Sequence, residues 1–237
     1  AVKAMLVASD GGPSAVVTAD AAEASRFAAE LTSLGMNAVV LEARDFWLRP
    51  VSGYSREYEH RRIGCLYRLC RKDFDVVVLD AEALSQKYIS KEYLLKNSFS
   101  IKSGREYDFE GLKEKLVDLG YVRAEQIEGT GQFAARGDIL DIFSPGEQNP
   151  VRIDFFGDSV EQIAYFDADS QRRIKKADEI MILPAAERQE VDFAALEKYA
   201  KTSSVVKNQK LHEVIMEDLN GGDFKDRYMA FYKDSPS

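Results

Sequence analysis

The stretch GQFAARGDILDIFSPGEQNPVRIDFFGDSVEQIAYF, residues 131–166, decides the fold, because short apolar runs alternate in it with turn residues. Four runs predict consecutive strands, at 131–136, 138–143, 151–156 and 160–166. The Pro, Gly and Asn residues of SPGEQNP predict a hairpin loop between the second and third strands. With one helix at about 109–119 and a further strand at 179–184, this region is predicted to be a mostly antiparallel β module.

The preceding hundred residues have a different texture. The β-branched runs at 15–19, 37–41 and 75–80 are typical of buried strands. Between the first two runs, apolar residues recur at helical spacing and predict a helix. Asp20 is its plausible N-cap, and Gly35 ends it. A strand, a helix and a strand of this length indicate a crossover connection and hence a parallel sheet. With a second helix at about 55–71, the region is predicted to be an α/β layer.

Helical periodicity returns after Pro184, at 191–200 and 208–219. We therefore predict a discontinuous α/β domain formed by residues 1–97 and 187–237, with residues 98–186 as an inserted β-rich domain. The chain begins with Ala1 rather than Met, so we expect it to be a piece of a longer protein.

Composition excludes a disordered, a collagen-like and a disulfide-scaffold protein. Hydrophobic residues make up 45% and charged residues 30% of the 237 positions, as in an ordinary globular chain. No apolar run approaches the roughly 18 residues of a membrane helix, so we expect a cytoplasmic protein with no membrane partner. Residues 101–190 carry 12 basic and 19 acidic side chains, which disfavours nonspecific DNA binding by this region.

The sequence predicts no catalytic residue, metal or cofactor. Cys65 and Cys70, with His60 and His212, do not have zinc-ligand spacing. No G-x-x-x-x-G-K-[ST] phosphate loop occurs, and Asp80, at the end of a predicted strand, lacks the adjacent Glu of a nucleotide hydrolase. No histidine lies beside a Ser or Cys in a glycine turn.

A basic cluster precedes the second predicted helix and continues along it. It consists of Arg49, Arg56, Arg61, Arg62, Arg68, Arg71 and Lys72. Interleaving with Glu57 and Glu59 favours a solvated helix face, and a nucleic-acid contact is the alternative.

The run VRIDFF, residues 151–156, carries the candidate binding residues. Strand alternation places Val151, Ile153 and Phe155 on one face, and it leaves Arg152, Asp154 and Phe156 on the other. Arginine and aromatic side chains dominate binding hot spots, and Arg136 ends a neighbouring predicted strand.

Two interpretations of that second face stay open at this point. It is either a binding surface, or a covered face on which Phe156 is buried and Arg152 pairs with Asp154 or Asp158.

Three motifs resemble the inserted β domain shared by bacterial excinuclease B and the transcription-repair coupling factor. They are FAARGDILDIF at 133–143, RIDFFGDSVEQI at 152–163 and FD at 166–167. A weaker similarity runs from the first strand through RRIGCLYRL and DVVVLDAEAL. The ending SQRRIKKADEIMILPAAE is similar to that of the coupling factor. Only FWLRPVSGYSREYEH stands where excinuclease B has a long damage-probing hairpin.

This resemblance implies a fold and a function. The α/β part would be a degenerate helicase-like, RecA-type layer without ATPase activity, with the family's phosphate loop upstream of Ala1. The β domain would dock excinuclease A and so bring nucleotide excision repair to a stalled RNA polymerase, with polymerase and DNA bound by other domains. Matched by motif, the partner-binding residues are Arg136, Arg152 and Phe156.

Two alternatives remain. The first is an ATP-dependent helicase-type repair enzyme similar to excinuclease B, and the second is a nonspecific DNA-binding module that uses the basic cluster.

Overall fold

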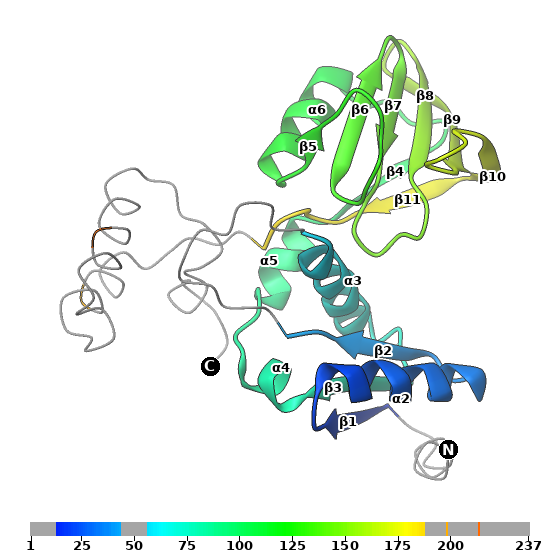
Figure 1. The fold of residues 1–237 in the computed structure, drawn as a ribbon. Helices are drawn as coiled ribbons and strands as arrows, with labels where there is room; N and C mark the ends of the chain where they lie inside the picture. The colour runs from blue at the N-terminus through cyan, green and yellow to red at the C-terminus, as the bar shows by residue number, and fades with distance from the viewer. Residues whose placement is uncertain (1–12, 44–55, 188–197, 199–212, 214–237) are drawn as a thin grey trace.

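The computed structural model describes residues 13–43 and 56–187, together with the single positions 198 and 213 (Figure 1). The elements, in chain order, are β1 (Ser14–Thr18), α2 (Ala21–Ser33), β2 (Ala38–Leu41), α3 (Glu57–Arg71), β3 (Val76–Asp80), α4 (Ala81–Ser85), α5 (Lys91–Lys96), β4 (Phe99–Lys102), α6 (Phe109–Asp118), β5 (Val122–Arg123), β6 (Gln132–Arg136), β7 (Ile139–Ile142), β8 (Val151–Phe156), β9 (Ser159–Phe166), β10 (Arg173–Ala177) and β11 (Glu179–Ile182). Helices and strands are mixed, in parallel and antiparallel sheets, which confirms an α/β class.

The first layer is a parallel sheet with strand order β1-β3-β2. Leu31 and its helical neighbours on α2 pack against Val76 and Val78, and Cys65 of α3 packs with residues such as Val39 in a separate cluster. The predicted strands and both longer helices are confirmed here. Asp20 is the N-cap of α2, because its side chain accepts a hydrogen bond from the amide of Glu23 at 2.7 Å.

The second layer is a six-stranded sheet with order β10-β9-β8-β7-β6-β5, antiparallel except for the β5–β6 pair. The four predicted strands and the hairpin loop between β7 and β8 are confirmed. The strand predicted at 179–184 is β11, which pairs with β4 in a separate two-stranded sheet. Strands β4, β5 and β10 and the short helices α4 and α5 were not predicted.

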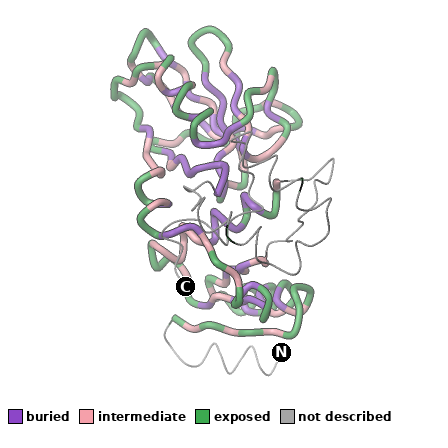
Figure 2. The backbone as a smooth tube through the Cα atoms, turned by 90° about the vertical axis from the view of Figure 1, so that its left-hand side faces the viewer, coloured by how far each residue is buried: buried purple, intermediate pink, exposed green. Residues whose placement is uncertain are grey.

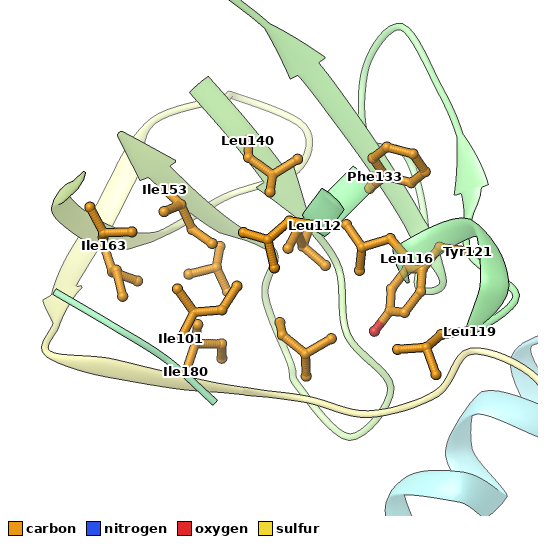
Figure 3. Close-up of a cluster of buried hydrophobic side chains, with 14 of the residues drawn as sticks. Ile101, Leu112, Leu116, Leu119, Tyr121, Phe133, Leu140, Ile153, Ile163 and Ile180 are labelled. Carbon is orange, nitrogen blue, oxygen red and sulfur yellow. The ribbon is translucent and has the colours of Figure 1, made fainter. Parts of the chain in front are cut away.

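The main core lies on one face of the six-stranded sheet (Figure 3). Phe133, Leu140 and Ile153 from the sheet meet Leu116 of α6 and Ile101 of β4, all of them buried. Figure 2 shows these buried strand segments joined by exposed turns. Burial of this apolar surface is the dominant stabilising contribution to the β module, and it leaves the opposite sheet face available for other roles.

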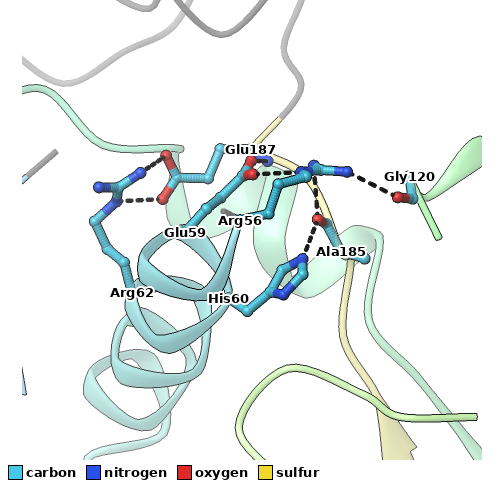
Figure 4. A network of polar contacts seen from close by, with 7 residues as sticks. All are labelled: Arg56, Glu59, His60, Arg62, Gly120, Ala185 and Glu187. Atoms are coloured by element: carbon cyan, nitrogen blue, oxygen red, sulfur yellow. Dashed lines mark hydrogen bonds and ion pairs between the residues drawn. The ribbon is translucent and has the colours of Figure 1, made fainter. Parts of the chain in front are cut away.

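The two layers meet at the N-terminal half of α3, where the chain returns after β11 (Figure 4). Arg62 donates to both carboxylate oxygens of Glu187, from Nε at 2.6 Å and Nη2 at 2.7 Å, and both side chains are buried. Burial lowers the pKa of Arg62, but the charge and hydrogen bonds of Glu187 more than offset this, so the net pKa is raised. This buried pair joins residues 125 positions apart.

Side chains at the start of α3 also bind the returning segment and the chain that follows α6. Arg56 donates to the carbonyls of Gly120 at 3.1 Å and Ala185 at 2.8 Å, and Glu59 accepts the Glu187 amide at 2.8 Å. The solvated-face interpretation of the basic cluster is therefore wrong for Arg56 and Arg62, because their guanidinium groups serve contacts between the layers. Arg49 lies outside the described residues.

The predicted association of residues 187–237 with residues 1–97 stays a prediction, because almost all of that C-terminal segment, including the helices expected at 191–200 and 208–219, lies outside the described residues. In the part of the chain that the structure describes, no helix combines the length and apolar character needed to cross a bilayer.

Candidate docking surface

The face of the six-stranded sheet that points away from the main core carries all three predicted binding residues. Strand register defines it, because directly paired residues of an antiparallel sheet share a face. Asp141 pairs with Ala134 and with Arg152, and Arg152 pairs with Ala164. We call this the outer face; its residues are Ala134, Arg136, Ile139, Asp141, Arg152, Asp154, Phe156, Gln162, Ala164, Phe166, Arg173 and Lys176.

Phe156 stands out on the outer face because the residue is 75% exposed. The preceding residue, Phe155, is buried and makes an edge-to-face contact with Phe109 at 5.0 Å between ring centroids. The predicted alternation along β8 is confirmed, and the interpretation of Phe156 as a core residue is wrong. A large exposed aromatic on a regular strand is available to a partner without any rearrangement of the fold.

Arg152 is not a free side chain. Its Nε and Nη2 donate to the two carboxylate oxygens of Asp141, each at 2.8 Å, and its guanidinium lies 4.5 Å from the centre of the Phe166 ring. The hydrogen bond to Asp141 raises the pKa of Arg152. Arg152 therefore pairs with a carboxylate, as the covered-face alternative expected, but that carboxylate belongs to Asp141 and not to Asp154 or Asp158. Arg152 keeps 18% of its side chain exposed on the outer face.

Arg136 ends β6 beside the same carboxylate. Its Nη2 lies 3.8 Å from Oδ2 of Asp141, and its side chain is 56% exposed. Gly137, in the turn to β7, has φ +55°, a backbone conformation that favours glycine. The structure thus brings Arg136 and Arg152 together around one carboxylate.

Asp141 is the residue that sequence reasoning missed. It lies in the middle of an otherwise apolar strand, and its side chain is only 2% exposed. An acidic residue inside the apolar run ILDI indicates a carboxylate that needs a charged partner. Its partners, however, depend on how β6, β7 and β8 align. The buried carboxylate holds the Arg152 guanidinium by two hydrogen bonds and lies 3.8 Å from the more exposed Arg136.

The rest of the outer face is partly covered. Ile127, from the loop between β5 and β6, is buried with Ala134 and Phe166 in a small apolar cluster. Arg152 rests on that cluster through Phe166. The exposed residues of the outer face are Arg136, Ile139, Phe156, Arg173 and Lys176, and Arg152 keeps part of its side chain exposed.

Burial raises the pKa of the Cys65 thiol to about 12, so this thiol stays protonated and unreactive near neutral pH. The described ranges contain no group of three or more His, Cys, Asp and Glu side chains placed to hold a metal ion. The arrangement on the outer face is suited to recognition by charge and apolar contact.

Comparison of the sequence with known proteins identifies the family of the chain. Residues 99–187 match the model of the UvrB interaction domain family. The chain is 36% identical over 127 residues to the transcription-repair-coupling factor of Myxococcus xanthus, an alignment that covers 53% of this chain and 11% of that protein. The chain belongs to the transcription-repair-coupling factor family.

Two further relatives support this assignment. The coupling factor of Bacillus subtilis is 30% identical over 197 residues, which cover 78% of this chain and 16% of that protein. The UvrABC system protein B of Helicobacter pylori is 32% identical over 145 residues, which cover 61% of this chain and 22% of that protein. The chain therefore spans about a tenth to a fifth of the length of these curated relatives.

Proposed function

We propose that the chain is a non-catalytic docking part of a coupling factor, and that its outer face binds excinuclease A in nucleotide excision repair. In this proposal docking brings the repair proteins to a stalled RNA polymerase, and polymerase and DNA are bound by other parts of a longer protein. The observation that carries the proposal is Phe156, which is 75% exposed and shares a sheet face with Arg152 and Arg136.

The geometry favours protein recognition for two reasons. Phe156 has only two side-chain torsions, so it offers a large apolar contact area at a small entropic cost. Arg152 is held by Asp141 before any partner arrives, and a preorganised guanidinium loses less freedom on binding a carboxylate or carbonyl. An exposed aromatic flanked by arginines is the composition found at binding hot spots.

We also propose that the α/β layer is a degenerate helicase-like layer without catalytic activity. Supporting this, Asp80 at the end of β3 is the N-cap of α4, and its carboxylate accepts a hydrogen bond from the Ala83 amide at 2.7 Å. A carboxylate committed to a helix cap is poorly placed to hold a magnesium–nucleotide complex. The test is magnesium-dependent ATP hydrolysis by a chain extended upstream of Ala1, where activity above background would overturn this part of the proposal.

The docking proposal is tested by titrating excinuclease A with the variants Arg136→Ala, Arg152→Ala and Phe156→Ala. We expect each to weaken binding by roughly 1 to 4 kcal/mol, the range for central interface residues. Matched controls on the α/β layer are Arg26→Ala and Leu84→Ala, which remove exposed side chains of the same kinds elsewhere and should bind like the parent.

Thermal unfolding separates lost contacts from lost structure. Phe156→Ala should melt like the parent, whereas Phe155→Ala, which removes a buried ring, should lose about 3 to 5 kcal/mol of stability. Arg152→Ala should lose some stability, because it leaves Asp141 buried with only the more distant Arg136. Folded Arg136→Ala and Phe156→Ala variants that bind excinuclease A as tightly as the parent would eliminate the docking proposal.

A further inference from the structure

A short basic run forms the edge strand of the six-stranded sheet. Arg172, Arg173, Lys175 and Lys176 fall within five positions at β10, and all four are exposed. They are a third of the 12 basic residues in 101–190, a region that carries 19 acidic ones. The charge of the molecule is therefore reversed locally at this strand.

Two of these side chains belong to the outer face. Lys176 pairs in register with Ala164, which in turn pairs with Arg152. Arg173 forms an ion pair with Asp154, the residue between Arg152 and Phe156 on that face of β8. Figure 1 shows β10 at the edge of the sheet away from α6, and within the described residues it pairs only with β9.

The turn that leads into β10 is linked directly to the docking residues. Arg152 Nη2 donates to Oε1 of Gln171 at 3.1 Å. Gln171 has φ +59°, an uncommon conformation for a residue other than glycine, and the turn is closed by Ser170, whose amide donates to Asp167 Oδ1 at 2.8 Å. The basic edge and the Arg152–Asp141 pair thus form one connected structure.

The charges on the outer face do not balance. Its cations are Arg136, Arg152, Arg173 and Lys176, whereas its carboxylates are Asp141 and Asp154, both already paired with arginines. The exposed acids Asp138 and Asp158 lie in the turns next to Phe156, so the surplus of positive charge lies on the β10 side of the face, on a chain whose net charge is −8. Such a surface attracts an acidic partner and repels other cationic surfaces.

We propose that the docking surface extends from Phe156 across Arg173 and Lys176 to β10, and that the partner presents an acidic patch there beside an apolar pocket for Phe156. This inference rests on the proposed docking function. The exposed acids Asp169 and Asp178 flank the basic run and would repel a continuous phosphate backbone, which favours a protein patch over nucleic acid. The exposed Ile174 adds apolar surface within the run.

The test measures association and dissociation rates with excinuclease A for the double variant Arg172→Glu/Lys176→Glu. These two side chains are exposed, and neither carries the Arg173–Asp154 or Arg152–Asp141 pair, so folding should be preserved. The matched control is Lys87→Glu/Lys91→Glu, which makes the same change in net charge on exposed residues of the α/β layer. The parent and Phe156→Ala are measured alongside.

We expect the double variant to associate at least about tenfold more slowly at about 50 mM salt, with the difference shrinking to within about twofold at about 500 mM, because exposed charges are screened. The control should associate like the parent, and Phe156→Ala should mainly dissociate faster. A double variant that binds like the parent while Phe156→Ala is weakened would overturn this inference and leave the docking function intact.

Three other outcomes would overturn the proposed acidic patch. Equal slowing by the control would show a net-charge effect and overturn the local acidic patch. Binding of duplex DNA by the parent that the double variant abolishes, with excinuclease A binding unchanged, would assign β10 to nucleic acid and overturn the inference. If the parent does not bind excinuclease A at all, the docking proposal fails and this inference fails with it.

Discussion

At the scale of single residues, Asp141 organises the proposed docking surface although its own side chain is only 2% exposed. Its carboxylate accepts two hydrogen bonds from Arg152 and lies 3.8 Å from Arg136. A buried carboxylate is stable only because these cations compensate its loss of hydration. Asp141 therefore orients Arg152, whereas a partner would touch the exposed Arg136 and Phe156.

The first prediction concerns Asp141→Asn. The amide keeps the size of the side chain but removes its charge and replaces one acceptor oxygen with a donor that faces a guanidinium. We expect a loss of about 1 to 3 kcal/mol in the free energy of unfolding, measured by urea denaturation, together with weaker binding of excinuclease A. The control is Asp138→Asn in the exposed β6–β7 turn, and equal behaviour of the two variants would contradict the proposed role of Asp141.

A second residue-scale prediction concerns pH. His60 is buried, and its Nε2 lies 3.1 Å from the Ala185 carbonyl oxygen. Burial, assisted by the nearby positive charge of Arg56, lowers the pKa of His60 below its usual value of 6.5. The unfolded chain therefore binds a proton more readily than the folded chain, so stability should fall as the pH falls through about 6.5.

Urea denaturation between pH 7.5 and pH 5.5 checks this expectation, with a slope of at most about 1.4 kcal/mol per pH unit from this group. In His60→Gln the side-chain amide can still donate to Ala185 but does not titrate, so the slope over this range should flatten. A variant with the same slope as the parent would assign the pH dependence to other groups.

At the scale of elements, α3 and the β7–β8 hairpin loop approach one another at two glycines. A Cβ added to Gly64 would lie 2.7 Å from the Cα of Gly146, a distance that backbone atoms cannot accommodate without moving apart. Gly146 has φ +86°, so the loop is held in a conformation that favours glycine. This close approach sets the distance between the α/β layer and the β module.

We expect Gly64→Ala to destabilise the protein by about 1 to 3 kcal/mol, although alanine is intrinsically the better helix former by about 1 kcal/mol. The control is Gly129→Ala, where an added Cβ meets no atom within 4 Å. Thermal unfolding compares the two variants. An unchanged or increased melting temperature for Gly64→Ala would show that the hairpin loop moves aside at little cost.

At the scale of the whole molecule, the buried Arg62–Glu187 pair joins the helix of one layer to the segment that returns from the other. Removing one partner leaves the other charge buried, so Arg62→Ala should cost about 3 to 5 kcal/mol in chemical denaturation. The double variant Arg62→Met/Glu187→Met removes both charges and should recover much of that loss. If the double variant were no more stable than Arg62→Ala, the cost would come from lost packing and not from the unpaired charge.

The sequence by itself determined the features that depend on local periodicity. A strand alternates with period two whatever its neighbours are, so VRIDFF was sufficient to place Phe155 and Phe156 on opposite faces. For the same reason the runs of 131–166 predicted their own strands, and Asp20 predicted the start of α2. Their apolar and polar residues follow patterns that can be read without knowing what lies opposite.

Tertiary structure alone decided the features that depend on which segments meet. RIKKA has no apolar alternation, and it is a strand because its backbone pairs with β9. Arg152 has several candidate carboxylates nearby in the sequence, and the register of β7 against β8 selects Asp141. Arg62 lies in a run typical of a solvated helix, but Glu187, 125 residues away, is its buried partner. Pairings over such separations are set by the packing of whole layers, which no local pattern encodes.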